Sequence, residues 1–190
     1  MALPTPMVGA PISATGAIAR APLGTTLPTD ASSALDQRFE ELGLIGEDGV
    51  SLAQERSTDD IHAWGGSVVR KIQTEYSENF TFTLMESTKA EVLKAVYGAD
   101  NVKVTGKNIA ITHNATPAEP AVYVITMKDG DMLRRFVIPN GQLSVDGDTA
   151  YSHSDVIQYS ASVGALNDEK GNSSYEYVST GTTSTVSDSH

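Results

Sequence analysis

The pair Asp129-Gly130 constrains the fold most, because it stands between two apolar-rich runs, residues 121–128 and 131–138. An Asp-Gly pair in this setting favours a β-hairpin closed by a type I′ turn, which needs positive φ at both central residues. With this pair at the centre of the turn, Tyr123 would lie opposite Phe136, and side-chain packing would hold the register.

A second hairpin is predicted upstream, from residues 67–75 and 79–85. Phe80, Phe82 and Leu84 alternate with threonines, which is the period of a strand with one buried face.

One short helix is predicted between the hairpins, at about residues 88–97. Thr88 and Glu91 have the spacing of a capping box, and Gly98 fits the left-handed position after a helix. The apolar stripe that should face the sheet consists of Val92, Leu93, Val96 and Tyr97.

The remaining chain favours further short strands and turns. We expect a strand that ends at Pro22, a partly helical segment at 29–41, and a turn at 139–142. Other expected strands lie at 42–55 (a hairpin with an acidic tip), 101–112 (with a turn at Gly106), 155–165 and 175–178. About eight to ten strands with one helix indicate a mainly β sandwich or barrel.

The domain organisation follows from composition. Residues 1–15 are rich in Pro, Ala and Gly and are predicted to be a flexible arm, either disordered or ordered against a neighbouring copy. Residues 16–178 form one β domain, and residues 179–190 a Ser/Thr-rich tail. The amino terminus lacks the basic start and apolar core of a secretory signal, so none is expected.

A long inter-strand loop is predicted before the second hairpin, because residues 57–60 form a polar cluster and a Gly-Gly pair follows. The single tryptophan, Trp64, lies in it. It either folds back on the core of its own chain or anchors a contact between subunits. The residues singled out in this loop are Asp59, Asp60, His62, Trp64, Gly65 and Gly66.

The charge excludes a general DNA clamp. The chain has 13 Lys and Arg residues, 24 Asp and Glu residues and a net charge of −11, so its surface repels phosphate. It could still line a channel through which DNA passes without sticking. Glu75 and Glu78 are candidates for the acidic lining, although an ordinary outer-surface position is at least as favoured.

No motif indicates catalysis, a cofactor or a metal. The four histidines are scattered, and the absence of cysteine excludes disulfides and thiolate zinc sites. Nucleophile elbows, phosphate loops and dinucleotide fingerprints are missing. We therefore expect a protein that is not an enzyme, and no apolar run is long enough to span a membrane.

Several stretches together resemble the major tail tube protein of long-tailed phages of actinobacteria. They are Arg20–Thr25 with Leu27–Asp30, Leu42–Val50, Asp60–Gly66 running into Val68–Arg70, and Phe80–Glu86 before a helix that ends at Val96–Gly98.

The resemblance implies a structural subunit of the virion tail, assembled in the host cytoplasm. Such subunits form hexameric rings that stack into a hollow tube for DNA ejection. The region 47–66 would be the long loop that bridges subunits together with the terminal arms. The implied partners are further copies of the chain, the tape-measure protein, and the terminator and distal tail proteins. The alternative is a β-domain for virion decoration or receptor binding.

Overall fold

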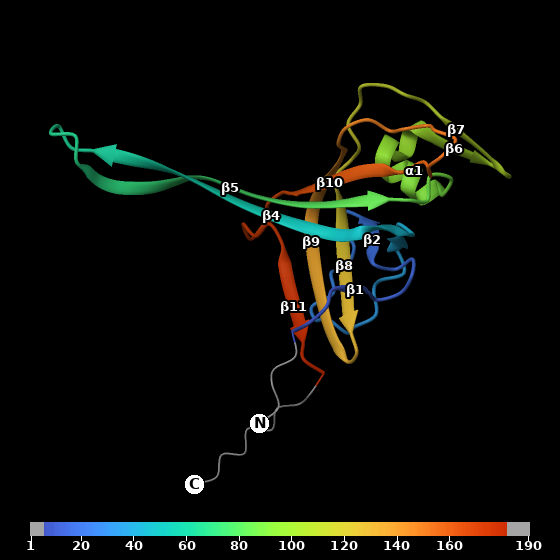
Figure 1. The fold of residues 1–190 in the computed structure, drawn as a ribbon, viewed down its shortest axis with the longest axis horizontal. Helices are drawn as coiled ribbons and strands as arrows, with labels where there is room; N and C mark the ends of the chain where they lie inside the picture. Colours follow the sequence, from blue (N-terminus) through green and yellow to red (C-terminus); the bar gives the residue numbers. More distant parts are fainter. Residues whose placement is uncertain (1–5, 182–190) are drawn as a thin grey trace, which may run out of the picture.

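The computed structural model describes residues 6–181 and shows a β body from which one long two-stranded ribbon projects (Figure 1). The prediction of a mainly β, sandwich-like fold with one short helix is confirmed. The strands are β1 (Ala10–Pro11), β2 (Ile18–Pro22), β3 (Glu40–Glu41), β4 (Ile45–His62), β5 (Val68–Leu84), β6 (Val102–Thr105), β7 (Asn108–Ile111), β8 (Ala121–Asp129), β9 (Met132–Val145), β10 (Tyr159–Ala165) and β11 (Tyr175–Ser179). The helix α1 spans Ala90–Tyr97 and leads into a short 3-10 turn at Ala99–Asn101.

Nine strands form one antiparallel sheet in the order β3-β2-β8-β9-β10-β5-β4, with β1 added to β8 and β11 added to β9. Strand β9 joins the two halves of this sheet: its first part pairs with β11 and its second part pairs with β10. The buried cluster lies between the halves, since it combines side chains of β2, β5, β8 and β10. The helix α1 and the small β6–β7 hairpin contribute Val92, Leu93 and Val102 to the same cluster.

The helix forms where the apolar spacing predicted it, but its start differs. Lys89 is the N-cap residue and no side chain caps the helix, so the expected capping box of Thr88 and Glu91 is wrong. Gly98 has a φ of 90°, which confirms its predicted role at the helix end.

The hairpin of β8 and β9 is confirmed, but its register is shifted. Asp129 pairs with Met132, so Gly130 and Asp131 are the central turn residues. Gly130 alone has positive φ, at 57°, which matches a type II′ turn rather than type I′. Consequently Phe136 lies opposite Ile125, not opposite Tyr123.

Four other local predictions are wrong. Residues 67–75 and 79–85 do not form a hairpin, because residues 68–84 are one continuous strand, β5, which pairs with β4 and β10. The segment 29–41 is not helical: the carboxylate of Asp30 accepts the backbone N–H groups of Ser32 and Ser33 in a local turn. Residues 139–142 continue β9 instead of turning. The expected acidic hairpin tip at 46–49 is a register shift within β4.

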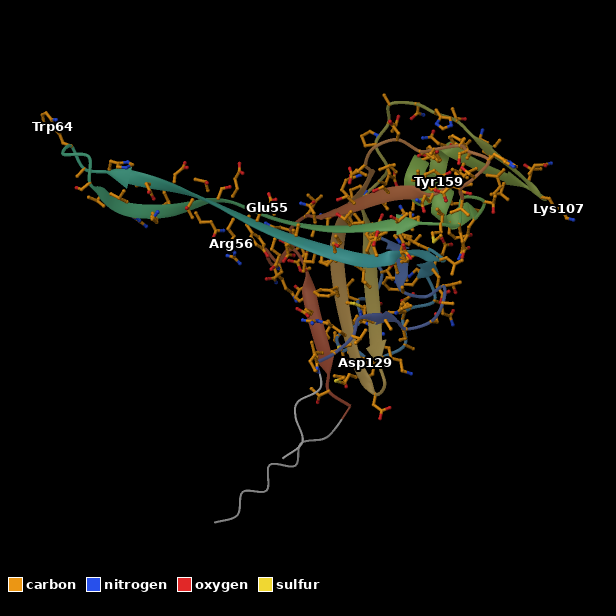
Figure 2. The ribbon with its side chains drawn as sticks, in the orientation of Figure 1. Glu55, Arg56, Trp64, Lys107, Asp129 and Tyr159 are labelled. Carbon is orange, nitrogen blue, oxygen red and sulfur yellow. The ribbon has the colours of Figure 1, made fainter. Side chains whose placement is uncertain are left out.

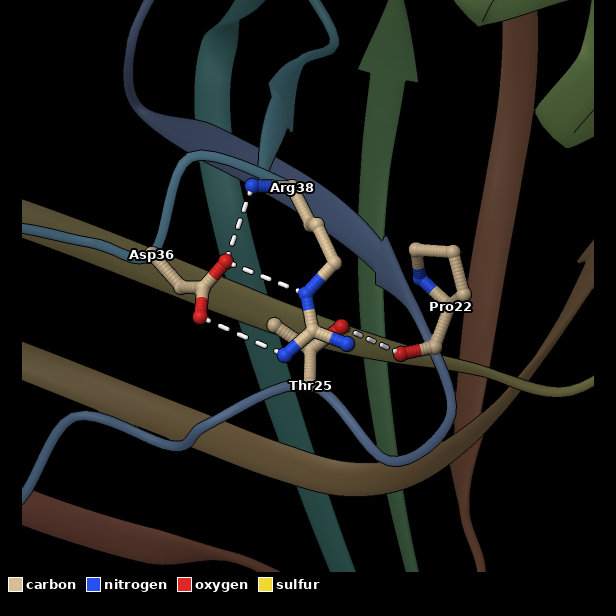
Figure 3. A network of polar contacts seen from close by, with 4 residues as sticks. All are labelled: Pro22, Thr25, Asp36 and Arg38. Carbon is tan, nitrogen blue, oxygen red and sulfur yellow. Dashed lines mark hydrogen bonds and ion pairs between the residues drawn. The ribbon is translucent and has the colours of Figure 1, made fainter.

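Side-chain contacts hold the irregular segment after β2 (Figure 3). Thr25 donates its hydroxyl to the carbonyl of Pro22 at 2.7 Å. Arg38 donates to the carboxylate of Asp36, with Nε 3.1 Å from Oδ1, and this bond lowers the pKa of Asp36. These contacts are local, and the segment is held against the sheet by Arg135 of β9, whose guanidinium donates to the carbonyls of Asp30 and Ser33 at 3.0 and 2.9 Å.

The described part of the N-terminal arm lies along β8 of the same chain. Ala10 pairs with Lys128, and the backbone N–H of Val8 donates to the carboxylate of Asp129 at 2.8 Å. The boundaries of the arm and of the Ser/Thr-rich tail remain predictions, and residues 1–5 and 182–190 lie outside the described residues.

Candidate self-assembly surface

The feature that dominates the molecule is the distal part of the β4–β5 hairpin, residues 51–77, which we call the ribbon. Every residue from Ser51 to Ser77 is exposed, and the ribbon extends well beyond the body (Figure 1). An isolated two-stranded hairpin is marginally stable in water, because it has no third strand or packed face. The ribbon therefore has the properties of an element whose packing partners lie outside the chain.

The prediction that residues 47–66 form a loop is wrong, because most of them form a strand. Residues 45–62 form β4, which pairs with β5 along its length. Asp59, Asp60 and His62 are thus strand residues, while Trp64, Gly65 and Gly66 form the connecting turn. All six lie in the outer part of the ribbon.

The turn at the tip is locally closed. The N–H of Ala63 donates to the carbonyl of Ser67, and the N–H of Gly66 donates back to Ala63, both at 2.8 Å. Trp64 points away from the ribbon (Figure 2) and its side chain is fully exposed, with 107% relative accessibility. The alternative in which Trp64 folds back on its own core is therefore wrong. Other exposed apolar side chains near the tip are Ile61, Val68 and Val69.

The strand pairing divides the ribbon into two faces, because directly opposite residues share a face. Glu55 pairs with Ser77 and Arg56 pairs with Tyr76. Glu55 and Arg56 accordingly point to opposite sides of the ribbon (Figure 2).

On the Arg56 face, the charged groups have partners within the ribbon. The guanidinium of Arg56 lies 4.5 Å from the ring centroid of Tyr76, and Lys71 forms an ion pair with Asp60 at 3.0 Å. The amide of Gln54 donates to Glu78 on the same face. This face is therefore nearly neutral.

Near the body the Glu55 face is small, polar and acidic, and we call it the small-residue face. Its ribbon members are Glu55 opposite Ser77, Ser57 opposite Glu75 and, nearer the tip, Asp59 opposite Ile72 and Ile61 opposite Arg70. None of these three carboxylates has an ion pair among the described residues. The face continues over the body, on the side of the sheet away from Phe80 and Phe82, through Ser51, Ala53, Thr81, Thr83, Ser144, Ser160 and Ser162.

The two sequence-predicted acidic candidates lie in different environments. Glu75 is exposed on the small-residue face, whereas Glu78 is 5% exposed and lies on the opposite face. The carboxylate of Glu78 accepts hydrogen bonds from Tyr76, Gln54 and, at 2.7 Å, Ser174. Glu78 thus joins the base of the ribbon to the segment before β11.

Glu78 gives the folded chain a predicted pH dependence. Burial raises the pKa of Glu78, whereas its three hydrogen bonds lower it. The hydrogen bonds together have the larger effect, so the pKa lies below the usual 4.5. A lowered pKa contributes stability that is present above the pKa of the unfolded chain and lost as pH falls through the folded value. Glu78→Gln should lower the free energy of unfolding at pH 7 by about 1.5–3 kcal/mol, the worth of hydrogen bonds to a charged group.

This prediction is checked by urea unfolding of the monomer between pH 7 and pH 3. The variant should lose less stability than the wild type over this range, since it lacks the titrating carboxylate. Glu75→Gln is the matched control and should behave like the wild type. An identical acid dependence in Glu78→Gln and wild type would contradict the assignment.

The long edge of β4 is unpaired. Strand β4 is the last in the order of the sheet and pairs only with β5 within the described residues. A strand of 18 residues with a free row of N–H and C=O groups is a template for pairing with another chain.

Among residues 6–181, no cluster of three His, Asp or Glu side chains could hold a metal ion. Within the same range, no helix has the length and apolarity needed to cross a bilayer.

The comparisons with known proteins agree with this geometry. A family model described as phage tail tube protein matches residues 8–187. A search of curated proteins found no match. The resemblance drawn from the sequence to tail tube proteins is confirmed by the family match. The chain therefore belongs to the phage tail tube protein family, a structural family of the virion tail rather than a family of enzymes.

Proposed function

We propose that copies of this chain close into hexameric rings, and that the rings stack into a hollow tail tube through which DNA leaves the particle. The observation that carries the proposal is the ribbon, in which every residue from 51 to 77 is exposed in the single chain. Pairing in an assembly would give the ribbon its missing packing partners and would remove the free edge of β4.

The small-residue face suits the wall of the lumen. Its serine and threonine side chains keep the surface even and hydrated, and Glu55, Asp59 and Glu75 supply negative charge. Like charge repels the phosphates of passing DNA, so the duplex slides without binding. The predicted acidic lining is thus proposed for Glu75 and not for Glu78, which is buried.

The partners follow from this role. The tape-measure protein would fill the lumen before DNA does, and terminator and distal tail proteins would contact the ends of the tube. As the resemblance of residues 16–98 suggests, we expect the phage to infect an actinobacterial host.

Negative-stain electron microscopy tests the proposed assembly. Purified protein examined by negative-stain electron microscopy at increasing concentration should show rings with a central hole, then tubes. A stable monomer at every concentration that instead binds cells or glycans would favour the decoration or receptor-binding alternative and overturn the proposal.

The lumen assignment has its own test, in which Glu55, Asp59 and Glu75 are all changed to lysine. Tubes of this variant should bind a short DNA duplex, and the bound duplex should resist nuclease because it lies inside the tube. The matched control changes Asp100, Glu119 and Asp148, which are exposed on other parts of the chain, to lysine. Bound DNA should remain digestible in that control, and equal protection in both variants would contradict the assignment of the face.

A further inference from the structure

The two ends of β4 carry complementary chemistry. At its distal end, residues 61–71 contain Arg70 and Lys71 and no acidic residue. Lys71 is paired with Asp60 at 3.0 Å, so Arg70 is the cation of this segment that has no ion pair among the described residues. Trp64 projects from this end without any packing against its own chain. A fully exposed tryptophan beside positive charge is a typical anchor for a contact with another chain.

At the proximal end of β4, a pocket of about 230 Å³ opens between β4, β8 and the N-terminal segment. Its apolar wall is formed by Ile45, Val50, Ile125 and Met127. Small residues form much of the rest, among them Gly9, Ala14, Ala17, Gly46 and Gly49. The shortage of side-chain bulk at these positions is what leaves room for an aromatic ring.

The charged residue that lines this pocket is Glu47, whereas the neighbouring Asp48 lines a different pocket, with Ser51 and Thr81. The pocket is therefore apolar inside and acidic at its border, which is the complement of the tip. A carboxylate at this border can accept the indole N–H, the single polar group of a tryptophan side chain.

We propose that Trp64 of one copy inserts into this pocket of a second copy. The inference rests on the proposed self-assembly and adds the residues that make the contact. The chain's own Trp64 cannot reach the pocket, because about 15 strand residues, or about 50 Å, separate Glu47 from His62 along β4. Arg70 of the inserted tip would then lie near Glu47 of the receiving copy.

The contact joins two different surfaces, so it repeats from copy to copy instead of closing a pair. It also gives the N-terminal segment a function, since Gly9 and Ala14 belong to the wall of the receiving pocket. Assembly would in that case depend on the segment being held against β8, as it is through Ala10 and Lys128.

A second cavity, of about 370 Å³, lies against β9 and β11 and is lined in part by Leu27, Thr29 and Tyr177. Lys170 is part of its lining together with Asp168 and Glu169, so this cavity has a cation at its border that the first pocket lacks. It serves as the internal comparison in the test.

The test uses the absence of cysteine in the chain, which makes every engineered cysteine unique. Ala63→Cys places a thiol beside Trp64, Ala14→Cys places one at the border of the proposed pocket, and Thr29→Cys places one at the second cavity. Ala63→Cys is mixed with each of the other two variants under assembly conditions and oxidised. The proposal predicts a cross-linked pair with Ala14→Cys at a yield about tenfold above that with Thr29→Cys.

Cross-linking to Thr29→Cys alone, with tubes still forming, would overturn the docking site and leave tube assembly intact. Tubes that form without either cross-link would also overturn the docking site and leave tube assembly intact. Failure of all variants and the wild type to assemble would overturn the proposed function as well. As an independent readout, Trp64→Ala should raise the protein concentration needed for assembly about tenfold or more, as expected for a buried aromatic anchor, and unchanged assembly would contradict the proposal.

Discussion

Replacing residues 57–75 with a two-residue Asn-Gly turn is expected to give a folded monomer that no longer assembles. Arg56 and Tyr76 lie directly opposite each other, so a tight turn can join β4 to β5 at this pair. The excised residues are all exposed, and none belongs to the buried cluster. The cut therefore removes assembly contacts without removing core packing.

Thermal unfolding measures whether the shortened monomer remains stable, and sedimentation velocity measures whether it still assembles. The melting temperature of the monomer should change by no more than about 3 °C, since substitutions away from the core have small effects. No rings or tubes should form at concentrations at which the wild type assembles. Lys107→Ala, at the tip of the other projecting hairpin (Figure 2), is the control and should assemble normally. Normal tubes from the shortened chain would show that the ribbon is dispensable.

The ribbon is also the element that the sequence described least well, for a physical reason. Sequence periodicity detects a strand when one of its faces is buried and the other is not. Phe80, Phe82 and Leu84 meet that condition in this chain, and the strand that they predicted is present. Residues 51–77 have no buried face in the single chain, so the polar sequence before Gly66 gives the pattern of a loop, and the continuity of β5 through residues 76–78 is not detected.

Glycine was misleading at two positions because it serves more than one purpose. Gly141 suggested a turn, but it lies within β9, where a Cβ would approach Tyr123 Cδ2 to 2.7 Å. This glycine is needed for close packing and not for chain reversal. At Gly130 the turn was predicted correctly, but the sequence does not determine which of the central positions the glycine takes, and the register shifted accordingly.

Composition indicated where the candidate assembly residues lie in the chain, but not which secondary structure they form. The six candidate residues within the range 59–66 do lie at the outer end of the ribbon, although as strand and turn rather than loop. The strand pairing shows which of the two acidic candidates, Glu75 and Glu78, is exposed and which is buried. They lie three residues apart on one strand, so the alternation of faces places them on opposite sides of the ribbon, and Glu75 is exposed whereas Glu78 is buried.

The body of the domain should respond to mutation in the opposite way to the ribbon, and Phe80→Ala is the sharpest case. Phe80 is fully buried, and its ring meets that of Phe136 edge-on with 5.5 Å between centroids. It lies opposite Leu52 on one side and Val163 on the other, so it links the two neighbouring strands of the sheet. Removing a buried phenylalanine ring costs about 3–5 kcal/mol, a large share of the roughly 5–15 kcal/mol that stabilises a typical domain.

Urea unfolding of monomeric protein should show this loss, and the melting temperature should fall by about 6–20 °C for a chain of this size. Trp64→Ala is the informative control, because it removes a larger aromatic side chain that has no contact with its own core. Its monomer stability should equal that of the wild type, although its assembly is impaired. Comparable losses of monomer stability in both variants would mean that Trp64 packs on its own chain in solution. This result would contradict the inference that the packing partners of the ribbon lie in other copies.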